Sequence, residues 1–545
     1  MSTATRREGI NKPLIGADVR WTGSAGLSAP VQPAGAAYSG EGGATESPGE
    51  ASRWYVLFVY SYISALQSLL WITWSSVPTP SSHFLCESSV AGNVSSCETS
   101  ATTLDLFLDE GPIAYCCVVP LAAYLLSRRN GLRRSIILGA SMCLFASVVR
   151  SLPILLGQSG RAARPWLGLA LAHLGQTTNA AVAPLVVASP AYLSLVWFPV
   201  SQRNTATSIA NVANALGRAV GFYLGPAILD AAVAKRGDGG GDGDGSGSAA
   251  VEAADGSMSV HGMDQLLLLE VLIAAVPFLC AICYMPNAPE SPPSAAAMEE
   301  RRSHTDWQSC TQGFAQLAAD ARVCLTQPSL VLLMLGGGLQ MAMYGGWSGV
   351  LTPALTSAPV SLSMEQAGLL GTLNTLAGIC GGILTALLCD TPRFNRSLKP
   401  IMTVLCALSV LCFGAMALAV PNPFNYILQM PGGGPLSYGW LALLCTAAGF
   451  FRGGLDPLYF ELVAEEAHPI PAGTAGGVLT FFYHALLCVC LTLPPALLTR
   501  WLLVLMAGCM VVSGVLLSMA KISYKRSTLA ALAITAGTAA KAVDS

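Results

Sequence analysis

Charged residues are scarce in this chain of 545 residues. Lys, Arg, Asp and Glu make up 11% of it, where an average soluble domain carries about 25%. The net charge of -2 provides no basic surface for nucleic acid, so no nucleic-acid partner is expected. No phosphate loop of the form G-x-x-x-x-G-K-[ST] occurs, which argues against an ATP-driven pump. The six histidines are scattered and show no nucleophile–base pattern, so we do not expect an enzyme.

Metal-binding patterns are also missing. Most of the 17 cysteines lie in apolar stretches where Cys packs as a small apolar side chain, and the span cysteines Cys116, Cys117, Cys143, Cys380, Cys406 and Cys488 show no C-x-x-C or Cys/His spacing. We therefore expect neither a metal nor a cofactor. Cys86 and Cys97 differ from the rest because they flank a glycosylation sequon at Asn93 in a polar loop. On an oxidising side of a membrane, a Cys86–Cys97 disulfide and a glycan at Asn93 are expected; the alternative is two free thiols and an unused sequon.

Apolar stretches, in contrast, are abundant. About twelve of them are roughly 20 residues long, enough to cross a bilayer of ~30 Å at 1.5 Å per residue. The sequence therefore predicts an all-α, polytopic membrane protein with twelve transmembrane helices in two six-helix halves. The predicted spans lie at 53–77, 104–126, 135–157, 166–190, 205–230, 264–284, 328–354, 366–389, 400–421, 438–464, 473–497 and 501–520.

The segments around the spans set the domain organisation. Residues 1–52 are rich in Gly, Ser, Ala and Pro and are expected to form a disordered cytosolic tail. Lys and Arg concentrate in both tails, in the central linker and in the loops after the second and eighth spans, so the positive-inside rule places these segments in the cytosol. The remaining predicted parts are the N-terminal half 53–284 with a Gly/Asp-rich outer loop 231–262, the linker 285–327, the C-terminal half 328–520 and the tail 521–545.

Each half repeats a basic turn after its second span. The second copy, GGILTALLCDTPRFNR, carries Asp390, Arg393 and Arg396. It resembles the G-x-x-x-D-R-x-G-R-R motif of the major facilitator superfamily, and the resemblance implies that Asp–Arg pairing locks the cytosolic side of the two halves. The first copy, LLSRRNGLRRS, keeps Arg133 but has no Asp in the corresponding place, which weakens the expected ion pair there.

The fifth span contains GRAVGFYLGP, with small residues at every fourth position: Gly217, Gly221 and Gly225, followed by Pro226. Such spacing makes a groove in which another helix can approach closely. The run is similar to the antiporter motif that the superfamily carries at this place, although close packing requires no antiport. Arg218 is too costly to face lipid, so we expect it to face the central cavity or a neighbouring helix.

Longer runs resemble one family within that superfamily. HLGQTTNAAVAP (173–184), LVWFPVSQRNTATSIANVANALGRAVGFYLGPAIL (195–229), GGWSGVLTP (345–353) and YFELVAEEAHPIPAGTAGGVLTFF (459–482) are similar to solute carrier family 49. That family includes the feline leukaemia virus subgroup C receptors, which transport haem, choline and ethanolamine. WFPxxxRNTATSIAN and GWSGVL resemble its "disrupted in renal carcinoma 2" branch, associated with lysosomal, proton-driven export of pyridoxine.

The resemblance implies a substrate cage made of Trp71, Gln176, Tyr344 and His484. The first three match cavity positions of the choline-transporting relatives, whereas His484 stands where those relatives have Gln. An aromatic box suits a quaternary ammonium through cation–π attraction, or stacks a pyridine ring. A His in place of Gln favours a ligand with hydroxyls, or a titrating site, over choline. The alternative is that each aromatic ring only packs between helices.

Carboxylates inside the spans are candidates for proton coupling. Glu461 and Glu465 are four residues apart and so share a helix face. Together with His484, they are expected to bind a proton from an acidic compartment. The alternative for the two glutamates is a structural role near the cytosolic end of the tenth span. Glu110 is expected near a membrane edge, in contact with water.

The combined prediction is a secondary-active transporter that alternates access around a midplane site in the lipid bilayer and moves a small organic solute. Proton-coupled export of pyridoxine or a related vitamin or amine is the leading hypothesis, and a choline, ethanolamine or haem facilitator is an alternative. A membrane nutrient sensor or receptor without transport is the alternative from another class. The run Pro13-Leu14-Ile15 resembles the sorting signals of lysosomal carriers, so a lysosomal or vacuolar membrane is expected rather than the plasma membrane.

Overall fold

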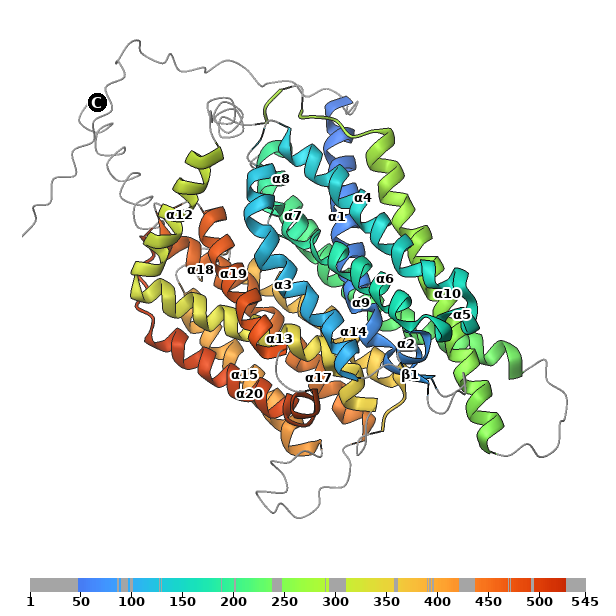
Figure 1. Cartoon of the computed structure of the whole chain (residues 1–545). Coiled ribbons are helices and arrows are strands. Elements are labelled where there is room, and N and C mark those ends of the chain that lie inside the picture. The colour runs from blue at the N-terminus through green and yellow to red at the C-terminus, as the bar shows by residue number, and fades with distance from the viewer. Residues whose placement is uncertain are drawn as a thin grey trace, which may run out of the picture. The chain divides into compact units, whose positions relative to one another are not determined.

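Helices make up nearly all of the residues that the computed structural model of the chain describes (Figure 1). Ten of the described helices are long and apolar enough to cross a membrane, and the expected spans 166–190 and 438–464 are each divided into shorter helices. The described residues are 48–85, 88–89, 97–98, 101–126, 128, 130–187, 189–199, 202–237, 248–289, 291–293, 310–356, 361–389, 391, 394, 397–420, 437–468, 470, 472–491 and 495–525.

The helices from α1 to α10 are called the N-terminal helix group. Within it α1 packs along α9, and α4 packs between α6 and α10. The elements are α1 (Pro48–Ser76), α2 (Pro78–Leu85), β1 (Ser88–Ser89), β2 (Cys97–Glu98), α3 (Ala101–Leu126), α4 (Gly131–Ser151), the 3₁₀ helix η3 (Leu152–Leu156), α5 (Gly157–Ala163), α6 (Pro165–Ala180), α7 (Ala183–Val187), α8 (Pro190–Trp197), α9 (Arg203–Gly237) and α10 (Ser248–Cys283).

The helices from α13 to α20 are called the C-terminal helix group, and α12 precedes them. Within this group α13 packs against α19 and α20, and α14 packs along α17. The elements are α12 (Cys310–Thr326), α13 (Pro328–Thr356), α14 (Met364–Cys389), α15 (Leu398–Ala419), α17 (Tyr438–Gly453), α18 (Leu455–Ala467), α19 (Ala472–Leu491) and α20 (Pro495–Met519).

The two divided spans occupy equivalent places, as the fourth span of each predicted half. α6 ends at Ala180, and Pro184 follows without the N–H that would continue the helix. α17 ends at Gly453 and α18 begins at Leu455, with Pro457 in its first turn. Discontinuous helices in equivalent positions of two repeats point to the place where secondary transporters bind their solute. The α17–α18 break is therefore a candidate solute-binding site.

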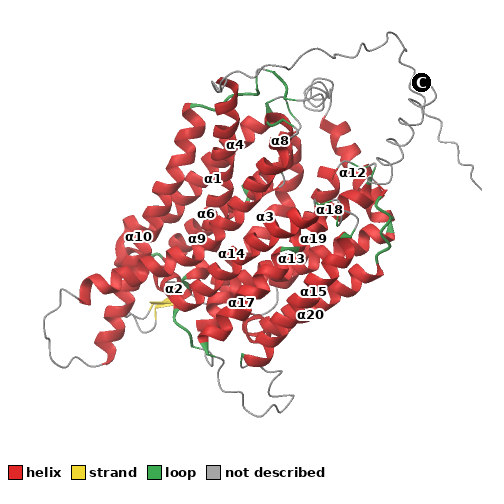
Figure 2. Cartoon of the chain, turned by 180° about the vertical axis from the view of Figure 1, so that it is seen from behind, coloured by secondary structure: helices red, strands yellow, loops and turns green. Residues whose placement is uncertain are grey.

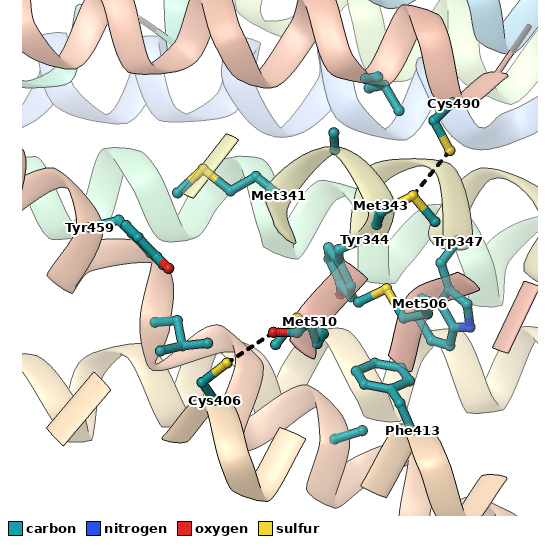
Figure 3. Close-up of a cluster of buried hydrophobic side chains, with 14 of the residues drawn as sticks. Met341, Met343, Tyr344, Trp347, Cys406, Phe413, Tyr459, Cys490, Met506 and Met510 are labelled. Carbon is teal, nitrogen blue, oxygen red and sulfur yellow. Dashed lines mark hydrogen bonds between the residues drawn. The ribbon is translucent and has the colours of Figure 1, made fainter. Parts of the chain in front are cut away.

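Apolar side chains fill the interior of the C-terminal helix group, as the close-up in Figure 3 shows. Trp347 stacks on Tyr344 with ring centroids 5.6 Å apart and meets the edge of Phe413 at 5.9 Å. The thiol of Cys490 lies 3.5 Å from the sulfur of Met343. Soft sulfur atoms and flat rings adapt to irregular gaps between helices. This packing fixes α13, which carries several of the polar residues described below.

The two helix groups contact each other through α9 with α14, through α3 with α19 and through α1 with α13. The Thr372 hydroxyl of α14 donates a hydrogen bond to the Ala219 carbonyl of α9 at 3.1 Å. Leu108 of α3 lies against Gly349 of α13, where an added Cβ would be 3.0 Å from the leucine. The N-terminal residues buried in the same apolar cluster as the C-terminal group are Ile72, Leu108 and Phe222.

Polar segments between the spans contain some secondary structure. β1 and β2 pair antiparallel, with Ser89 opposite Cys97, and lie beside α2 (Figure 2). Cys86 and Asn93 lie outside the described residues, so the disulfide and the glycan stay predictions. The expected outer loop 231–262 is partly helical, because α9 extends to Gly237 and α10 begins at Ser248. Ala-rich sequence on both sides of the Gly/Asp run favours helix over loop.

Candidate functional site

An ion pair bridges the break between α17 and α18. Arg452, near the end of α17, donates from one guanidinium nitrogen to both carboxylate oxygens of Asp456 at 2.6 Å. Asp456 lies in the first turn of α18. A cation near the C-terminus of one helix and an anion near the N-terminus of the next each complement a helix dipole. The arginine side chain is 7% exposed and the aspartate 34%, so the pair is sealed on one side and open on the other.

Residues of α13 extend this pair. Gln340 accepts a hydrogen bond from Arg452 Nε at 3.2 Å and donates one to Asp456 Oδ1 at 2.9 Å. One turn later, the Tyr344 ring lies under the guanidinium, 3.7 Å from the Arg452 Cζ atom to the ring centroid. The Tyr344 hydroxyl donates to Asn374 Oδ1 at 2.9 Å, and thereby ties α13 to α14. We call Gln340, Tyr344, Arg452 and Asp456 the central polar cluster.

A second arginine approaches this cluster from the other helix group. Arg218 of α9 lies with its Cζ atom 5.8 Å from the centroid of the Tyr344 ring. Its Nε atom is buried without a hydrogen-bond partner among the described residues. Arg452 is neutralised by Asp456, whereas no hydrogen bond to Arg218 is seen in the described part of the chain. Cations from both helix groups thus approach the ring of Tyr344.

His484 lies on the contact between α3 and α19. Its ring stacks on Tyr115 of α3 with centroids 3.5 Å apart, and Tyr483 lies beside it at 4.2 Å. Its Nδ1 atom is 2.8 Å from the Thr480 carbonyl, so the neutral tautomer that donates from Nδ1 fits this geometry. The His484 side chain is buried. Its stacked face is therefore occupied by the other helix group.

The Gln176 side chain contacts Trp71 through the Trp71 backbone carbonyl and not through the indole ring. The Gln176 side-chain nitrogen donates to the carbonyls of Trp71 and Phe107 at 3.2 and 3.0 Å. These bonds tie α6 to α1 and α3, and Gln176 is fully buried. The Trp71 ring is half-buried and lies against Gly111, where an added Cβ would be 2.6 Å from the indole nitrogen.

The four residues of the predicted cage therefore occupy different surroundings. Tyr344 is covered by Arg452, and His484 is covered by Tyr115. Gln176 anchors backbone, and only Trp71 keeps a partly open ring. No ring contact joins Trp71, Tyr344 and His484 among the described residues. Their role in substrate binding stays a prediction.

A second arginine–carboxylate pair lies inside the N-terminal helix group. Arg150 of α4 and Glu270 of α10 are 3.6 Å apart, and both side chains are 0% exposed. Arg150 also donates to the Leu70 carbonyl at 2.8 Å and lies over the Trp74 ring at 4.9 Å. The Thr73 hydroxyl donates to Glu270. Three helices are thus joined by one buried ion pair.

The expected proton-coupling glutamates sit on α18. Glu461 is exposed, whereas Glu465 is 4% exposed. Their neighbour Glu466 accepts hydrogen bonds from the backbone N–H groups of Ser523 and Tyr524. Burial raises the pKa of the Tyr524 hydroxyl, in the segment that follows α20. Glu466 therefore anchors the end of the described chain to α18, and the roles of Glu461 and Glu465 stay predictions.

The expected packing glycines line the α1–α9 contact. An added Cβ at Gly217 would lie 1.9 Å from the Ala65 carbonyl oxygen, so any side chain there requires the helices to separate. At Gly221 it would lie 2.4 Å from Ile72, and at Gly225 it would lie 2.9 Å from the Ser76 hydroxyl. Pro226 lies on the other side of α9, 3.1 Å from a Cβ added at Gly368.

Most of the expected gating residues cannot be placed. Asp390, Arg393 and Arg396 lie outside the described residues. Arg133, at the start of α4, donates from Nε to the Met285 carbonyl at 2.7 Å. This bond joins α4 to the segment after α10. The gating role of all four residues stays a prediction.

Sequence reasoning missed the residues that the structure joins most closely. Gln340, Arg452 and Asp456 each interrupt an apolar span, which is the signal that could have singled them out. Their pairing could not be read from the chain, because Gln340 and Asp456 are 116 residues apart. Glu110, expected near a membrane edge, contacts His173 and Thr177 of α6.

Comparisons with known proteins all match this chain to membrane transporters. The sequence profile of the Major Facilitator Superfamily matches residues 56–490. The solute carrier family 49 member 4 homolog of Xenopus tropicalis is 28% identical over 440 residues, which cover 81% of this chain and 84% of that protein. The choline/ethanolamine transporter flvcr2a of Danio rerio is 23% identical over 428 residues, which cover 78% of this chain and 76% of that one.

A solved structure supports the same fold. The crystal structure of a D-xylose–proton symporter has a TM-score of 0.58 to this chain at 13% identity, and the match covers 87% of this chain and 99% of that one. The expected all-α, polytopic membrane fold is therefore confirmed, and so is the expected resemblance to solute carrier family 49.

Proposed function

Because the chain belongs to the major facilitator superfamily, we propose that it is a secondary-active transporter that moves a small organic solute by alternating access. The observation that carries this proposal is the meeting of Arg218 and Arg452 on Tyr344. Arg218 comes from one helix group and Arg452 from the other. Polar residues shared by two repeats in mid-membrane are where such transporters bind their solute.

The contacts between the helix groups suggest which side is closed. Thr372 bonds the Ala219 carbonyl, and Leu108 lies against Gly349. With the orientation expected from the Lys and Arg distribution, Thr372, Leu108 and Gly349 lie in the outer halves of their helices and Ala219 lies near the middle of α9. We therefore take this arrangement to be closed on the outer side, with the solute site reached from the cytosol.

The charges near Tyr344 bear on the kind of solute. A permanent cation ~6 Å from the Arg218 guanidinium would be repelled by about 3 kcal/mol at an effective dielectric of about 20. Choline is such a cation. A neutral ring with hydroxyl groups avoids this cost and can hydrogen-bond Gln340, Asp456 or His484. Pyridoxine or a related vitamin is therefore the leading substrate, with choline and ethanolamine as the disfavoured alternatives.

Haem is the second candidate, for a specific reason. Its carboxylates would pair with Arg218, whose Nε atom is buried without a hydrogen-bond partner in the described part of the chain. An arginine that recognises a carboxylate gains charge-assisted hydrogen bonds. Competition between haem and pyridoxine therefore separates an anion site from a neutral one.

The membrane and the driving force are part of the proposal. The run Pro13-Leu14-Ile15 in the N-terminal tail favours a lysosomal or vacuolar membrane. Export from such a compartment can use its proton gradient, for which Glu461, Glu465 and His484 are the candidates taken from the sequence.

Reconstitution into proteoliposomes tests the function. Vesicles preloaded with unlabelled pyridoxine, choline, ethanolamine or haem should accumulate the matching labelled solute by counterflow. We expect pyridoxine to give the fastest counterflow, and an imposed proton gradient to drive its net accumulation. A sensor or receptor would bind a solute and transport none of the four. That result in vesicles containing correctly folded protein would contradict the proposal.

A further inference from the structure

A His–Glu pair lies inside the N-terminal helix group, apart from the central polar cluster. His173 Nδ1 of α6 contacts Glu110 Oε1 of α3, and the Thr177 hydroxyl donates to Glu110 Oε2 at 2.9 Å. Both carboxylate oxygens are therefore engaged by α6. Ionisable residues within membrane helices are costly and usually functional. This pair needs an explanation that packing alone does not supply.

The Glu110–His173 pair is partly exposed, unlike the Arg150–Glu270 ion pair behind it. The His173 side chain is 28% exposed and that of Glu110 is 17%, whereas Arg150 and Glu270 are both 0% exposed. Glu110 is nine residues from the start of α3 and His173 is eight from the start of α6. At 1.5 Å per residue, they lie about 13 Å and about 12 Å from the ends of these helices that are expected on the outer side.

Stacked rings connect the pair to the buried arginine. His173 stacks on Phe107 at 4.2 Å, and Phe107 stacks on Trp74 at 5.3 Å. Arg150 lies 4.9 Å over the Trp74 ring and pairs with Glu270. The stacked rings of Phe107 and Trp74 therefore lie between the Glu110–His173 pair and the Arg150–Glu270 ion pair.

The elements packed against α3 and α6 carry further titratable groups. α1 presents no charged side chain between 67 and 76, and neither η3 nor α7 carries one. Arg161 of α5 is held by Asp264 of α10 at 3.1 Å. The remaining titratable groups on these elements are Glu50, Arg53, Tyr55, Tyr60 and Tyr62 of α1; His83 of α2; Asp105, Asp109, Tyr115, Cys116, Cys117 and Tyr124 of α3; Arg133, Arg134 and Cys143 of α4; Cys310, Asp320, Arg322 and Cys324 of α12; Tyr483, His484, Cys488 and Cys490 of α19; and Arg500 and Cys509 of α20.

Accepting the proposed transport function, we propose that Glu110 and His173 together bind the proton that drives transport. With a neutral imidazole and an ionised carboxylate the pair carries one negative charge. One proton from the outer compartment makes the pair neutral overall, shared between the imidazole and the carboxylate. Release of that proton to the cytosol restores the negative charge, so one proton crosses per cycle.

The position of α3 explains how proton binding would reach the rest of the molecule. α3 carries Glu110, and also Leu108 against Gly349 and Tyr115 against His484 of the C-terminal helix group. α3 and α19 lie side by side in Figure 1. Weakening the hold of α6 on Glu110 would free α3 to shift at the contact between the two groups. Proton binding and the closed state of the outer side are thereby linked.

Infrared difference spectroscopy tests proton binding without any solute. The full-length protein in lipid vesicles is compared at about pH 7.5 and about pH 5, which bracket the reference His pKa of ~6.5. We expect a carboxylic acid C=O band that is absent in Glu110→Gln and has a moved pH midpoint in Thr177→Val. Asp264→Asn, which removes another carboxylate of this helix group held by a cation, should keep the band. The same band in Glu110→Gln would overturn the proposal.

Transport then separates this inference from the proposed function. With pyridoxine as probe, Glu110→Gln should lose accumulation driven by a proton gradient and keep counterflow, because exchange moves no net proton. Full gradient-driven accumulation by Glu110→Gln would overturn the proton site and leave the transporter intact. Wild-type protein without counterflow would contradict the proposed function, while the infrared result still decides whether Glu110 binds a proton. If Glu110→Gln does not fold, the Thr177→Val midpoint decides: no shift overturns the proposal.

Discussion

Two arginine–carboxylate pairs of the described residues, Arg150–Glu270 in the N-terminal helix group and Arg452–Asp456 in the C-terminal one, differ in how far their side chains are exposed. Arg150 and Glu270 are 0% exposed, whereas Asp456 is 34% exposed beside a buried Arg452. The first pair joins α4 and α10 within a sealed bundle. The second bridges the α17–α18 break and reaches the Tyr344 ring that Arg218 also approaches.

The difference in exposure suggests different roles for the two ion pairs. Separating a fully buried ion pair leaves uncompensated charges in a low-dielectric interior. Such a pair therefore holds together the helices that carry it. An open pair at a helix break can release one partner to a solute, at the place where the two helix groups meet. We therefore propose a structural role for Arg150 and Glu270, and a solute-binding role for Arg452 and Asp456.

The largest effect is expected from Glu270→Gln. This change leaves the Arg150 guanidinium charged and buried without its partner, at a cost of about 3–5 kcal/mol. The melting temperature of the purified protein should therefore fall steeply. Protein that does fold should keep its half-saturation for solute. A variant with normal melting and lost transport would place this pair in the binding site and break the comparison.

The next effect is expected from Asp456→Asn. Arg452 then loses its charge partner but keeps its hydrogen bond to Gln340. Because position 456 is 34% exposed, water can solvate the arginine and reduce the loss of stability. Transport should fall about tenfold to hundredfold, equivalent to roughly 1.4–2.7 kcal/mol, with a melting temperature near that of the wild type. Counterflow rates and thermal melting on the same preparation check both statements. A steep loss of melting temperature with normal counterflow would assign this pair the structural role.

Trp71→Ala tests whether the solute site extends from the central polar cluster to Trp71. Removing a stacking surface should weaken solute affinity by about 0.5–2 kcal/mol, or up to roughly thirtyfold. Protein abundance should change little, because the Trp71 ring is half-buried. Half-saturation of counterflow is the measurement. An unchanged value would make Trp71 a packing residue and limit the site to the central polar cluster.

The smallest effect is expected from Lys525→Met. Lys525 lies 3.8 Å from Glu466, with 38% of the lysine side chain and 2% of the glutamate side chain exposed. The lysine also donates to Gln327 Oε1 at 2.9 Å and to the Glu466 carbonyl at 3.0 Å. A long ion pair that is exposed on the lysine side contributes roughly 0–1 kcal/mol, and Glu466 keeps its bonds to Ser523 and Tyr524. Melting temperature should change by no more than a few degrees. A collapse in stability would show that exposure does not rank the ion pairs of this protein.

The sequence predicted the fold well because long apolar runs are a strong local signal. The sequence predicted close helix packing at Gly217, and Gly217 lies against the backbone of Ala65. It also predicted that Arg218 faces the cavity or a neighbouring helix, and Arg218 lies near the Tyr344 ring. It could not join Gln340 to Asp456 or Arg150 to Glu270, since each pair is more than a hundred residues apart in the chain. Long-range pairing depends on how helices pack, which local patterns do not encode.

Counterflow by Arg218→Gln tests the central claim most directly, because Arg218 is the residue of the N-terminal helix group that reaches Tyr344. The measurement uses the labelled solute, among pyridoxine, choline, ethanolamine and haem, that wild-type vesicles exchange fastest. We predict that Arg218→Gln melts like the wild type and loses most of its counterflow. Counterflow of wild-type rate and half-saturation in this variant would contradict a solute site shared by the two helix groups.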